Sequence, residues 1–343
     1  MKRHIFRLAW TTAAIVVICA LSTTGAAQKK GGGGGGGGPD GTTIFYHGLF
    51  SSSVFKMNSD GSAKTEMFSN PSGGTLECSY ELHNGQPWFM QKVDPGWETY
   101  EYAPVLRFFS GTGEYREFPL DFGTVDPEYM GQFRWVPGDQ EISFVDRRIV
   151  DGEVVEVGIF AVQVEYLDGA PTGISTPYLK VSTPTRIEEY LGVVPVVTGY
   201  DWSPDRLSIV YGTYEEVLFA AVRKLYILDS EGVRLIRNAG HSPKWAPGTV
   251  NRIVYIEEYS GGSAICTIGA DGSGWKSVLA VSTTQQNQKW LEKPEWSPTG
   301  ASIAYTLWTY SNSKGFGVNL YKVAASGSGN TKLGPVYRTI AWK

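Results

Sequence analysis

The chain has 343 residues, and its 30 Lys and Arg against 34 Asp and Glu give a formal net charge of −4 at pH 7. Nucleic-acid binding needs a concentrated basic face, and no run of Lys or Arg follows Lys30, so we expect no nucleic-acid partner. Only 3 cysteines are present, too few for a disulfide scaffold, so a hydrophobic core must hold the fold together.

Residues 1–27 have the layout of a cleaved signal peptide. Basic Lys2 and Arg3 precede an apolar run over 8–21, and small residues lead to a cleavage position after Ala27. The apolar run is shorter than the roughly 20 residues of a membrane-spanning helix. The cysteine in this segment follows an isoleucine, whereas lipidation needs a small residue there. We therefore expect a periplasmic or secreted protein with no membrane span after signal removal.

A glycine-rich flexible tether is expected over 28–38, because eight consecutive glycines carry no side chain to bury. The folded domain is then 39–343. It contains two cysteines, Cys78 and Cys266, in different repeat units. Two buried free thiols and a single disulfide bridge are both open at this point.

One motif recurs along 39–343: a Trp, a small residue, a Pro, turn residues, and then an apolar β-branched residue before an aromatic one. It reads WVPGDQEISF, WSPDRLSIVY, WAPGTVNRIVY and WSPTGASIAY from Trp135, Trp202, Trp245 and Trp296, which are 67, 43 and 51 residues apart. A strand that ends at the Trp runs into a tight turn, and the turn reverses it into a second strand.

A second hairpin follows each motif, with an alternating strand, a Gly-containing turn and a short return strand, as in KLYILDSEGVRLI from Lys224. Four short strands in each repeat of this length predict the blades of a β-propeller. Asp60, Asp229 and Asp271 stand in these turns, where their side chains can bind their own backbone. The fold class is therefore all-β.

The chain ends predict how the ring closes. The last residues, Ala341-Trp342-Lys343, form a strand with no hairpin after it, and the segment from Pro39 forms a hairpin with no Trp before it. Joined, they spell one complete repeat, so the two ends should pair and remove the open sheet edges. A degenerate unit over 78–119, with Tyr80 and Leu82 in place of Trp and Pro, brings the count to six blades. If this unit is not a blade, the ring has five.

Together the WSPD and WSPT turns, the DG turns and the following Ile-x-Tyr strands resemble the TolB-like propeller repeat family, a relative of the WD repeat. The resemblance covers 39–343 and implies a six-bladed propeller of four-stranded antiparallel blades. TolB has an additional N-terminal domain, and here only a glycine tether stands before the propeller. TolB's own partners are therefore not carried over, because propellers serve many roles.

The resemblance also places the inner strand of each blade at its Trp. Short turns then lie on one face, and the other receives the long connections, which we predict as loops over 94–102, 146–156, 183–199, 282–293 and 308–317. These connections are rich in aromatic residues, which are common at binding hot spots. The candidate binding residues are Trp97, Tyr100, Tyr129, Tyr190, Tyr259, Trp290 and Tyr310, with Tyr102 and Trp308 beside them. Packing between blades is the other explanation for these aromatics.

The residue before each motif Trp alternates in charge around the ring: Arg134, Asp201, Lys244 and Glu295. On inner strands these side chains should lie near the central channel, where neighbours of opposite charge can pair. We favour a structural ring over a ligand site.

No catalytic motif is evident, so we expect a protein that is not an enzyme and binds no cofactor or metal. The chain has no G-x-S-x-G nucleophile elbow. The histidines have no zinc-like spacing, although His47 and His241 on the long-loop face leave a shared metal site open.

The predicted function is recognition of a protein or peptide partner by a monomeric propeller through its long-loop face. The main alternative is a carbohydrate-binding or carbohydrate-active propeller, because aromatic residues also stack on sugar rings. Sugar chemistry would need two converging carboxylates, and the candidates are Asp94, Asp126, Glu128, Asp201 and Glu295. A third possibility is a structural surface protein held by its glycine tether.

Overall fold

A computed structural model describes residues 43–48, 51–70, 81–83, 86–93, 105–120, 131–138, 140–150, 153–182, 196–217, 220–336 and 338–343. The expected signal peptide, the tether and Cys78 lie outside these residues. Within the described part of the chain no helix has the length and hydropathy to cross a lipid bilayer.

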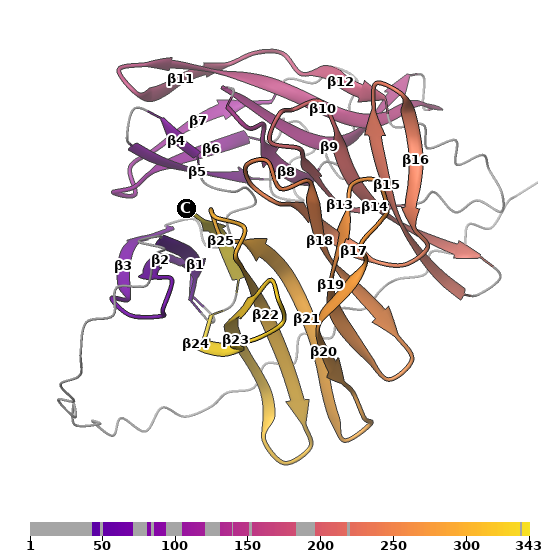
Figure 1. Ribbon diagram of the computed structural model, residues 1–343. Helices are drawn as coiled ribbons and strands as arrows, with labels where there is room; N and C mark the ends of the chain where they lie inside the picture. Colours follow the sequence, from indigo (N-terminus) through magenta and orange to yellow (C-terminus); the bar gives the residue numbers. More distant parts are fainter. Residues whose placement is uncertain are drawn as a thin grey trace, which may run out of the picture. The chain divides into compact units, whose positions relative to one another are not determined.

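The described residues form six antiparallel sheets, which are the blades of a six-bladed β-propeller (Figure 1). The first blade contains β1 (Thr43–His47), β2 (Ser53–Asn58), β3 (Thr65–Ser69) and β25 (Arg338–Trp342). The second contains β4 (Glu81–His83), β5 (Gln86–Val93), β6 (Val105–Ser110) and β7 (Tyr115–Pro119). The third contains β8 (Gly131–Trp135), β9 (Glu141–Val150), β10 (Glu153–Leu167), β11 (Ala170–Ile174) and β12 (Tyr178–Ser182).

The last three blades follow in chain order. The fourth contains β13 (Val196–Trp202), β14 (Ile209–Val217), β15 (Ala220–Asp229) and β16 (Gly232–Arg237). The fifth contains β17 (His241–Trp245), β18 (Arg252–Tyr259), β19 (Gly262–Gly269) and β20 (Lys276–Ser282). The sixth contains β21 (Asn287–Trp296), β22 (Ser302–Ser311), β23 (Gly315–Ala324) and β24 (Thr331–Gly334). The predicted all-β propeller and its six-blade count are therefore confirmed.

The turn after the motif Trp has a local cause in the fourth and sixth blades. In the fourth blade the Ser203 N–H donates to the Ser208 carbonyl at 2.9 Å, and the Ser203 hydroxyl donates to Asp205 Oδ1 at 2.5 Å. The sixth blade has the matching bonds: the Ser297 N–H donates to the Ser302 carbonyl at 2.8 Å, and the Ser302 N–H donates to the Ser297 hydroxyl at 3.0 Å. In these two blades the serine after Trp therefore closes the turn with its own side chain, whereas the third and fifth blades have Val136 and Ala246 there.

The aspartates of the second-hairpin turns also bind as predicted. Asp60 accepts from the Ser62 N–H at 2.8 Å, and Asp229 and Asp271 each accept from the N–H two residues on at 2.9 Å. This is the Asx-turn geometry that fixes a tight reversal. These three residues are turn formers at the ends of hairpins.

Pairing of the two ends of the domain closes the ring as predicted. β25 runs antiparallel to β1, with Ile44 opposite Trp342 (Figure 1). Backbone hydrogen bonds between Thr43 and Lys343 extend the pairing, at 2.6 Å and 2.9 Å. Because β25 occupies the edge that β1 would otherwise expose, the first blade is completed by the last strand.

The hydrophobic core lies where side chains of adjacent blades interdigitate. One buried cluster joins Phe108 of the second blade to Phe133 and Phe144 of the third, and another joins Tyr255 and Cys266 of the fifth to Leu225 of the fourth. The degenerate second unit therefore packs like the others. Cys266 is a free, buried thiol.

Candidate functional site

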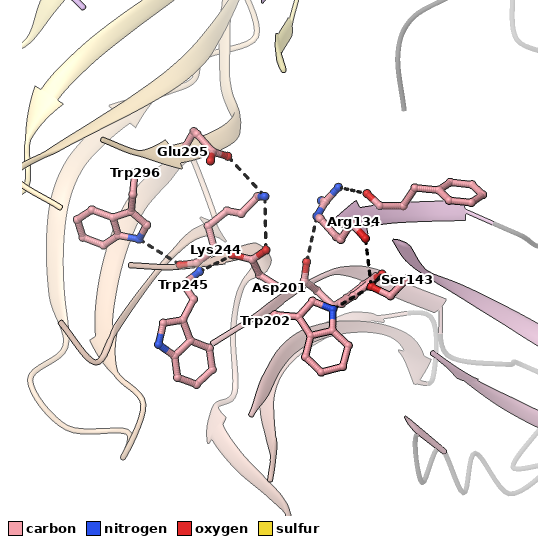
Figure 2. A network of polar contacts seen from close by, with 10 residues as sticks. Arg134, Ser143, Asp201, Trp202, Lys244, Trp245, Glu295 and Trp296 are labelled. Carbon is pink, nitrogen blue, oxygen red and sulfur yellow. Dashed lines mark hydrogen bonds and ion pairs between the residues drawn. The ribbon is translucent and has the colours of Figure 1, made fainter. Parts of the chain in front are cut away.

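The alternating charges of the inner strands meet between neighbouring blades. Lys244 Nζ lies 3.6 Å from Asp201 Oδ1 and 3.5 Å from Glu295 Oε2, so one ammonium group bridges the carboxylates of the two flanking blades (Figure 2). The three side chains are 16–27 % exposed. The ion pairs that the alternation predicts are therefore present at Lys244.

Backbone contacts add to this network. The Trp245 N–H donates to Asp201 Oδ2 at 2.8 Å, and the Arg134 guanidinium donates to the Tyr200 carbonyl at 3.3 Å (Figure 2). Arg134, Asp201 and Lys244 therefore each contact the inner strand of the next blade. This repeated contact supports a structural role for the inner-strand charges.

Two of the motif tryptophans contact the preceding blade. The Trp202 indole N–H donates to the Ser143 hydroxyl at 2.8 Å, and the Trp296 indole N–H donates to the Lys244 carbonyl at 3.1 Å (Figure 2). Ser143 is fully buried. Contacts thus run in both directions from the third blade to the sixth, and they join the inner strands β8, β13, β17 and β21 to their neighbours.

The predicted aromatic binding residues divide into two groups. Trp97, Tyr100, Tyr129 and Tyr190 lie outside the described residues, as does Tyr102. Three are described: Tyr259 at the end of β18, Trp290 on β21 and Tyr310 on β22. Tyr259 is 47 % exposed, and its hydroxyl donates to the Val281 carbonyl at 3.3 Å.

Two aromatic cross-strand pairs lie along the sixth blade. Trp290 is directly opposite Trp308, with ring centroids 6.1 Å apart and ring planes within 3° of parallel. Tyr310 is opposite Phe316, with centroids 4.7 Å apart. Side chains two residues apart on a strand point to the same face, so all four rings share one face of the sheet. We call Trp290, Trp308, Tyr310 and Phe316 the aromatic ladder.

The aromatic ladder lies on the same face of the sheet as buried core residues and extends from them toward the hairpin turn. Leu320 lies on the same face, is fully buried, and packs with Ile44 and Trp342 of the first blade. Further along, Trp308 is half-buried and donates its indole N–H to Glu292 Oε2 at 3.0 Å. At the tip Phe316 is 70 % exposed. The face therefore changes from packed core to accessible aromatic surface along one pair of strands.

The prediction of loops over 146–156 and 308–317 is wrong. β9 and β10 run to Val150 and from Glu153, and β22 and β23 run to Ser311 and from Gly315. The predicted connection over 282–293 is also partly strand, because β21 begins at Asn287. The physical reason is cross-strand pairing: β9 and β10 stay paired as far as Val150 opposite Glu153, and in the sixth blade the aromatic pairs lie along the strands that polar residues had suggested to be a loop.

Phe316 was not among the predicted binding residues. A signal for it existed, because Phe316, Val318 and Leu320 alternate with small or polar residues as a half-buried strand requires. The pattern places Phe316 on the apolar face of a strand, but it does not give the register that sets Phe316 opposite Tyr310.

A charged cluster lies beside Tyr259 at the junction of the fourth and fifth blades. Glu258 forms an ion pair with Arg223, and its Oε1 lies 3.4 Å from His241 Nε2. The contact with His241, and then the positive charge of Arg223, lower the pKa of Glu258 to about 2. Glu258 therefore stays ionised and helps to join β15, β17 and β18.

The two histidines considered for a metal site lie in different sheets. His47 is in β1 of the first blade and His241 is in β17 of the fifth. Among the residues that the structure describes, no three His, Cys, Asp or Glu side chains are grouped to hold a metal ion.

The candidate carboxylates for sugar chemistry are only partly described. Asp94, Asp126 and Glu128 lie outside the described residues. Asp201 and Glu295 are both bound to Lys244 as above.

Comparison with known proteins supports the fold. No family model and no curated protein matches the sequence. Among solved structures, a protein assigned as TolB from Agrobacterium tumefaciens has a TM-score of 0.51 at 15 % identity, over 88 % of this chain and 91 % of that one. The two chains share a fold.

Two further likenesses are weaker. TolB from Acinetobacter baumannii has a TM-score of 0.42 at 12 % identity, over 85 % of this chain and 65 % of that one. An oligogalacturonate lyase in complex with manganese has a TM-score of 0.46 at 12 % identity, over 85 % of this chain and 72 % of that one. At 15 % identity, the likeness to the Agrobacterium tumefaciens protein shows a fold and not an activity.

Proposed function

We propose that this chain is a non-catalytic, extracytoplasmic binding propeller that recognises a protein or peptide partner through the side on which its long hairpins end. The observation that carries the proposal is the aromatic ladder, which rises out of the core to Phe316 at 70 % exposure. Large aromatic side chains offer rigid contact area at a low cost in conformational entropy. An extracytoplasmic location rests on the signal-like segment 1–27.

The rigid scaffold suits a protein that binds a partner without a conformational change. Bridged inner strands and the β1–β25 closure hold the blades, so the ladder is presented in one geometry before a partner arrives. A preorganised surface loses little entropy on association. The protein then acts as a fixed platform for its partner.

The experiment is a pull-down from envelope extract with the full chain as bait. A second bait carries Trp290→Ala, Tyr310→Ala and Phe316→Ala. The matched control bait carries Trp275→Ala, which removes an aromatic side chain that is also exposed, at 47 %, but lies in the β19–β20 turn. Circular dichroism checks that all baits are folded. A protein that the parent and control baits retain and the ladder variant loses supports the proposal, and equal retention by all three baits refutes it.

Carbohydrate recognition is the second candidate, and the near-parallel Trp290–Trp308 pair favours it because indole rings stack on sugar faces. A glycan array with the same three baits separates the two candidates. Glycan binding that the ladder substitutions abolish, without capture of any protein, would replace the first proposal by the second.

A further inference from the structure

The face of the sixth blade that carries the aromatic ladder also carries one carboxylate. Glu292 lies two residues from Trp290 on β21, so the two side chains point to the same side of the sheet. One oxygen of Glu292, Oε2, accepts the Trp308 indole N–H at 3.0 Å, which places the carboxylate at the edge of that ring. No lysine or arginine of the described chain forms an ion pair with Glu292. A negative charge therefore lies beside the aromatic rings without a described counter-charge.

No lysine or arginine of β21, β22 or β23 shares this face between the hairpin turn and Glu292. Besides the aromatic ladder, cross-strand register places four uncharged residues there: Gln288, Thr306, Val318 and Leu320. The nearby lysines are placed elsewhere, because Lys289 is opposite Thr309 on the other face and Lys314 is in the turn between β22 and β23. Glu292 is therefore the one charged side chain on this part of the described face.

The rings and the carboxylate attract the same kind of group. The face of an aromatic ring carries partial negative charge and so attracts a cation. A cation that contacts Glu292 is also within reach of Trp290, since residues two apart on a strand are separated by about 6.6 Å. Tyr310 and Phe316 lie one step nearer the hairpin turn, with ring centroids 4.7 Å apart and ring planes inclined at 45°. This face therefore suits a ligand group with a positive head and an apolar stem.

Lysine and arginine side chains have this composition. Their long apolar stems cover hydrophobic surface while the charged head stays at a polar group. A divalent metal ion is less suitable, because it needs several oxygen ligands and this part of the face has a single carboxylate. A neutral sugar stacks on aromatic rings, but it would leave the charge of Glu292 without a counter-charge.

We propose that the aromatic ladder binds a lysine or arginine side chain of the partner, with the positive head between Trp290 and Glu292 and the apolar stem across Tyr310 and Phe316. This inference rests on the proposed function and specifies the chemistry of the partner. The apolar contact contributes affinity, and the carboxylate with the ring faces selects a basic residue over a neutral or acidic one.

The test uses an array of short peptides, each with one central lysine or arginine in an otherwise uncharged sequence, and affinities for the full chain are then measured by fluorescence anisotropy. One matched control set has norleucine at the centre, which keeps the apolar stem and lacks the charge. A second set has glutamate there, which reverses the charge. We expect lysine peptides to bind at least about fivefold more tightly than their norleucine counterparts, and glutamate peptides to bind most weakly.

The protein variants separate charge from fold. Glu292→Gln keeps an oxygen acceptor for the Trp308 indole N–H and removes only the charge, so the lysine peptides should lose at least about half of their advantage over the norleucine peptides. Glu231→Gln is the matched control: it removes one negative charge from an exposed turn of the fourth blade and should change either affinity less than about twofold. Phe316→Leu should weaken binding of the lysine peptides about twofold or more, and its 70 % exposure means that the fold is unaffected.

Three results would overturn the inference. They are no lysine or arginine peptide bound at up to about 1 mM, equal binding of the lysine and norleucine peptides, or a Glu292→Gln protein that keeps the full preference for lysine. Binding of a neutral oligosaccharide in place of every basic peptide belongs to the first of these results. If one of them occurs while the pull-down still captures a ladder-dependent protein, only the choice of a basic side chain fails. If the pull-down fails as well, the proposed function fails with it.

Discussion

Asp201 is the residue whose loss should most clearly reveal how the inner strands are joined. Its carboxylate accepts from the Trp245 N–H at 2.8 Å and lies 3.6 Å from Lys244 Nζ, and its side chain is 20 % exposed. Asp201→Ala removes both contacts and leaves a backbone donor of the next blade without its acceptor.

The expected cost has two parts. A hydrogen bond to a charged group contributes about 1.5–3 kcal/mol, and a partly exposed ion pair at this distance adds up to about 1 kcal/mol. Asp201→Ala should therefore lower the free energy of unfolding by about 2–4 kcal/mol. Asp201→Asn keeps an oxygen acceptor for the Trp245 N–H and loses only the charge, so about 1 kcal/mol is expected.

Urea unfolding followed by tryptophan fluorescence measures these differences as shifts in the midpoint. Glu231→Ala is the matched control, because it removes one negative charge from an exposed turn and should change stability by less than about 0.5 kcal/mol. Combining Asp201→Ala with Lys244→Ala gives the coupling between the pair. An Asp201→Ala protein as stable as the Glu231→Ala control, or an Asp201→Asn protein as damaged as Asp201→Ala, would refute the reasoning.

Three further predictions follow from single features. The pKa of Glu258 is about 2, against 4.5 in a free carboxyl. Its contribution to the free energy of unfolding should therefore be complete above about pH 4.5 and be lost as the pH falls through 2. Glu258→Gln should make stability depend less on pH in this range, and identical acid unfolding curves for the variant and the parent would contradict this. Burial raises the pKa of the Cys266 thiol to about 11, so peptide mapping should find it alkylated by iodoacetamide only after unfolding; rapid labelling of the folded chain would disprove the assignment. Deletion of 338–343 removes β25 with its buried Trp342. It should lower the free energy of unfolding by at least about 5 kcal/mol and promote aggregation through the exposed edge of β1. A stable monomer on size-exclusion chromatography would argue against closure of the ring by β25.

The ring could be predicted from sequence because its information is local and repeated. Each Trp–small–Pro turn specifies one strand reversal, and four copies at similar spacing specify a blade-like unit. Closure followed from one long-range inference, that the segment ending at Trp342 completes the motif begun at Pro39. The charges at Asp201, Lys244 and Glu295 could be placed for the same reason, since the motif sets their position on the inner strand.

The candidate site was harder because its determinants are not repeated. Serine, asparagine, lysine and glycine near 311–315 suggest a loop by composition, although only the three residues between β22 and β23 form the turn. The deciding interactions are the pairs of Trp290 with Trp308 and Tyr310 with Phe316, and these depend on register. A sequence pattern indicates that residues alternate, but it does not indicate which strand faces which.

Along the sixth blade, the contacts that join the inner strands lie at one end and the aromatic ladder lies at the other. At the base of β21, Glu295 is bound to Lys244, and the Trp296 indole N–H reaches the Lys244 carbonyl. At the other end of the hairpin, the exposed ring of Phe316 packs only on its cross-strand partner Tyr310 among the ring contacts of the described chain. A side chain that is 70 % exposed contributes little to folding, so Phe316 can be substituted at little cost in stability. The strands that the inner network holds together therefore also carry exposed residues that can be substituted without unfolding the propeller.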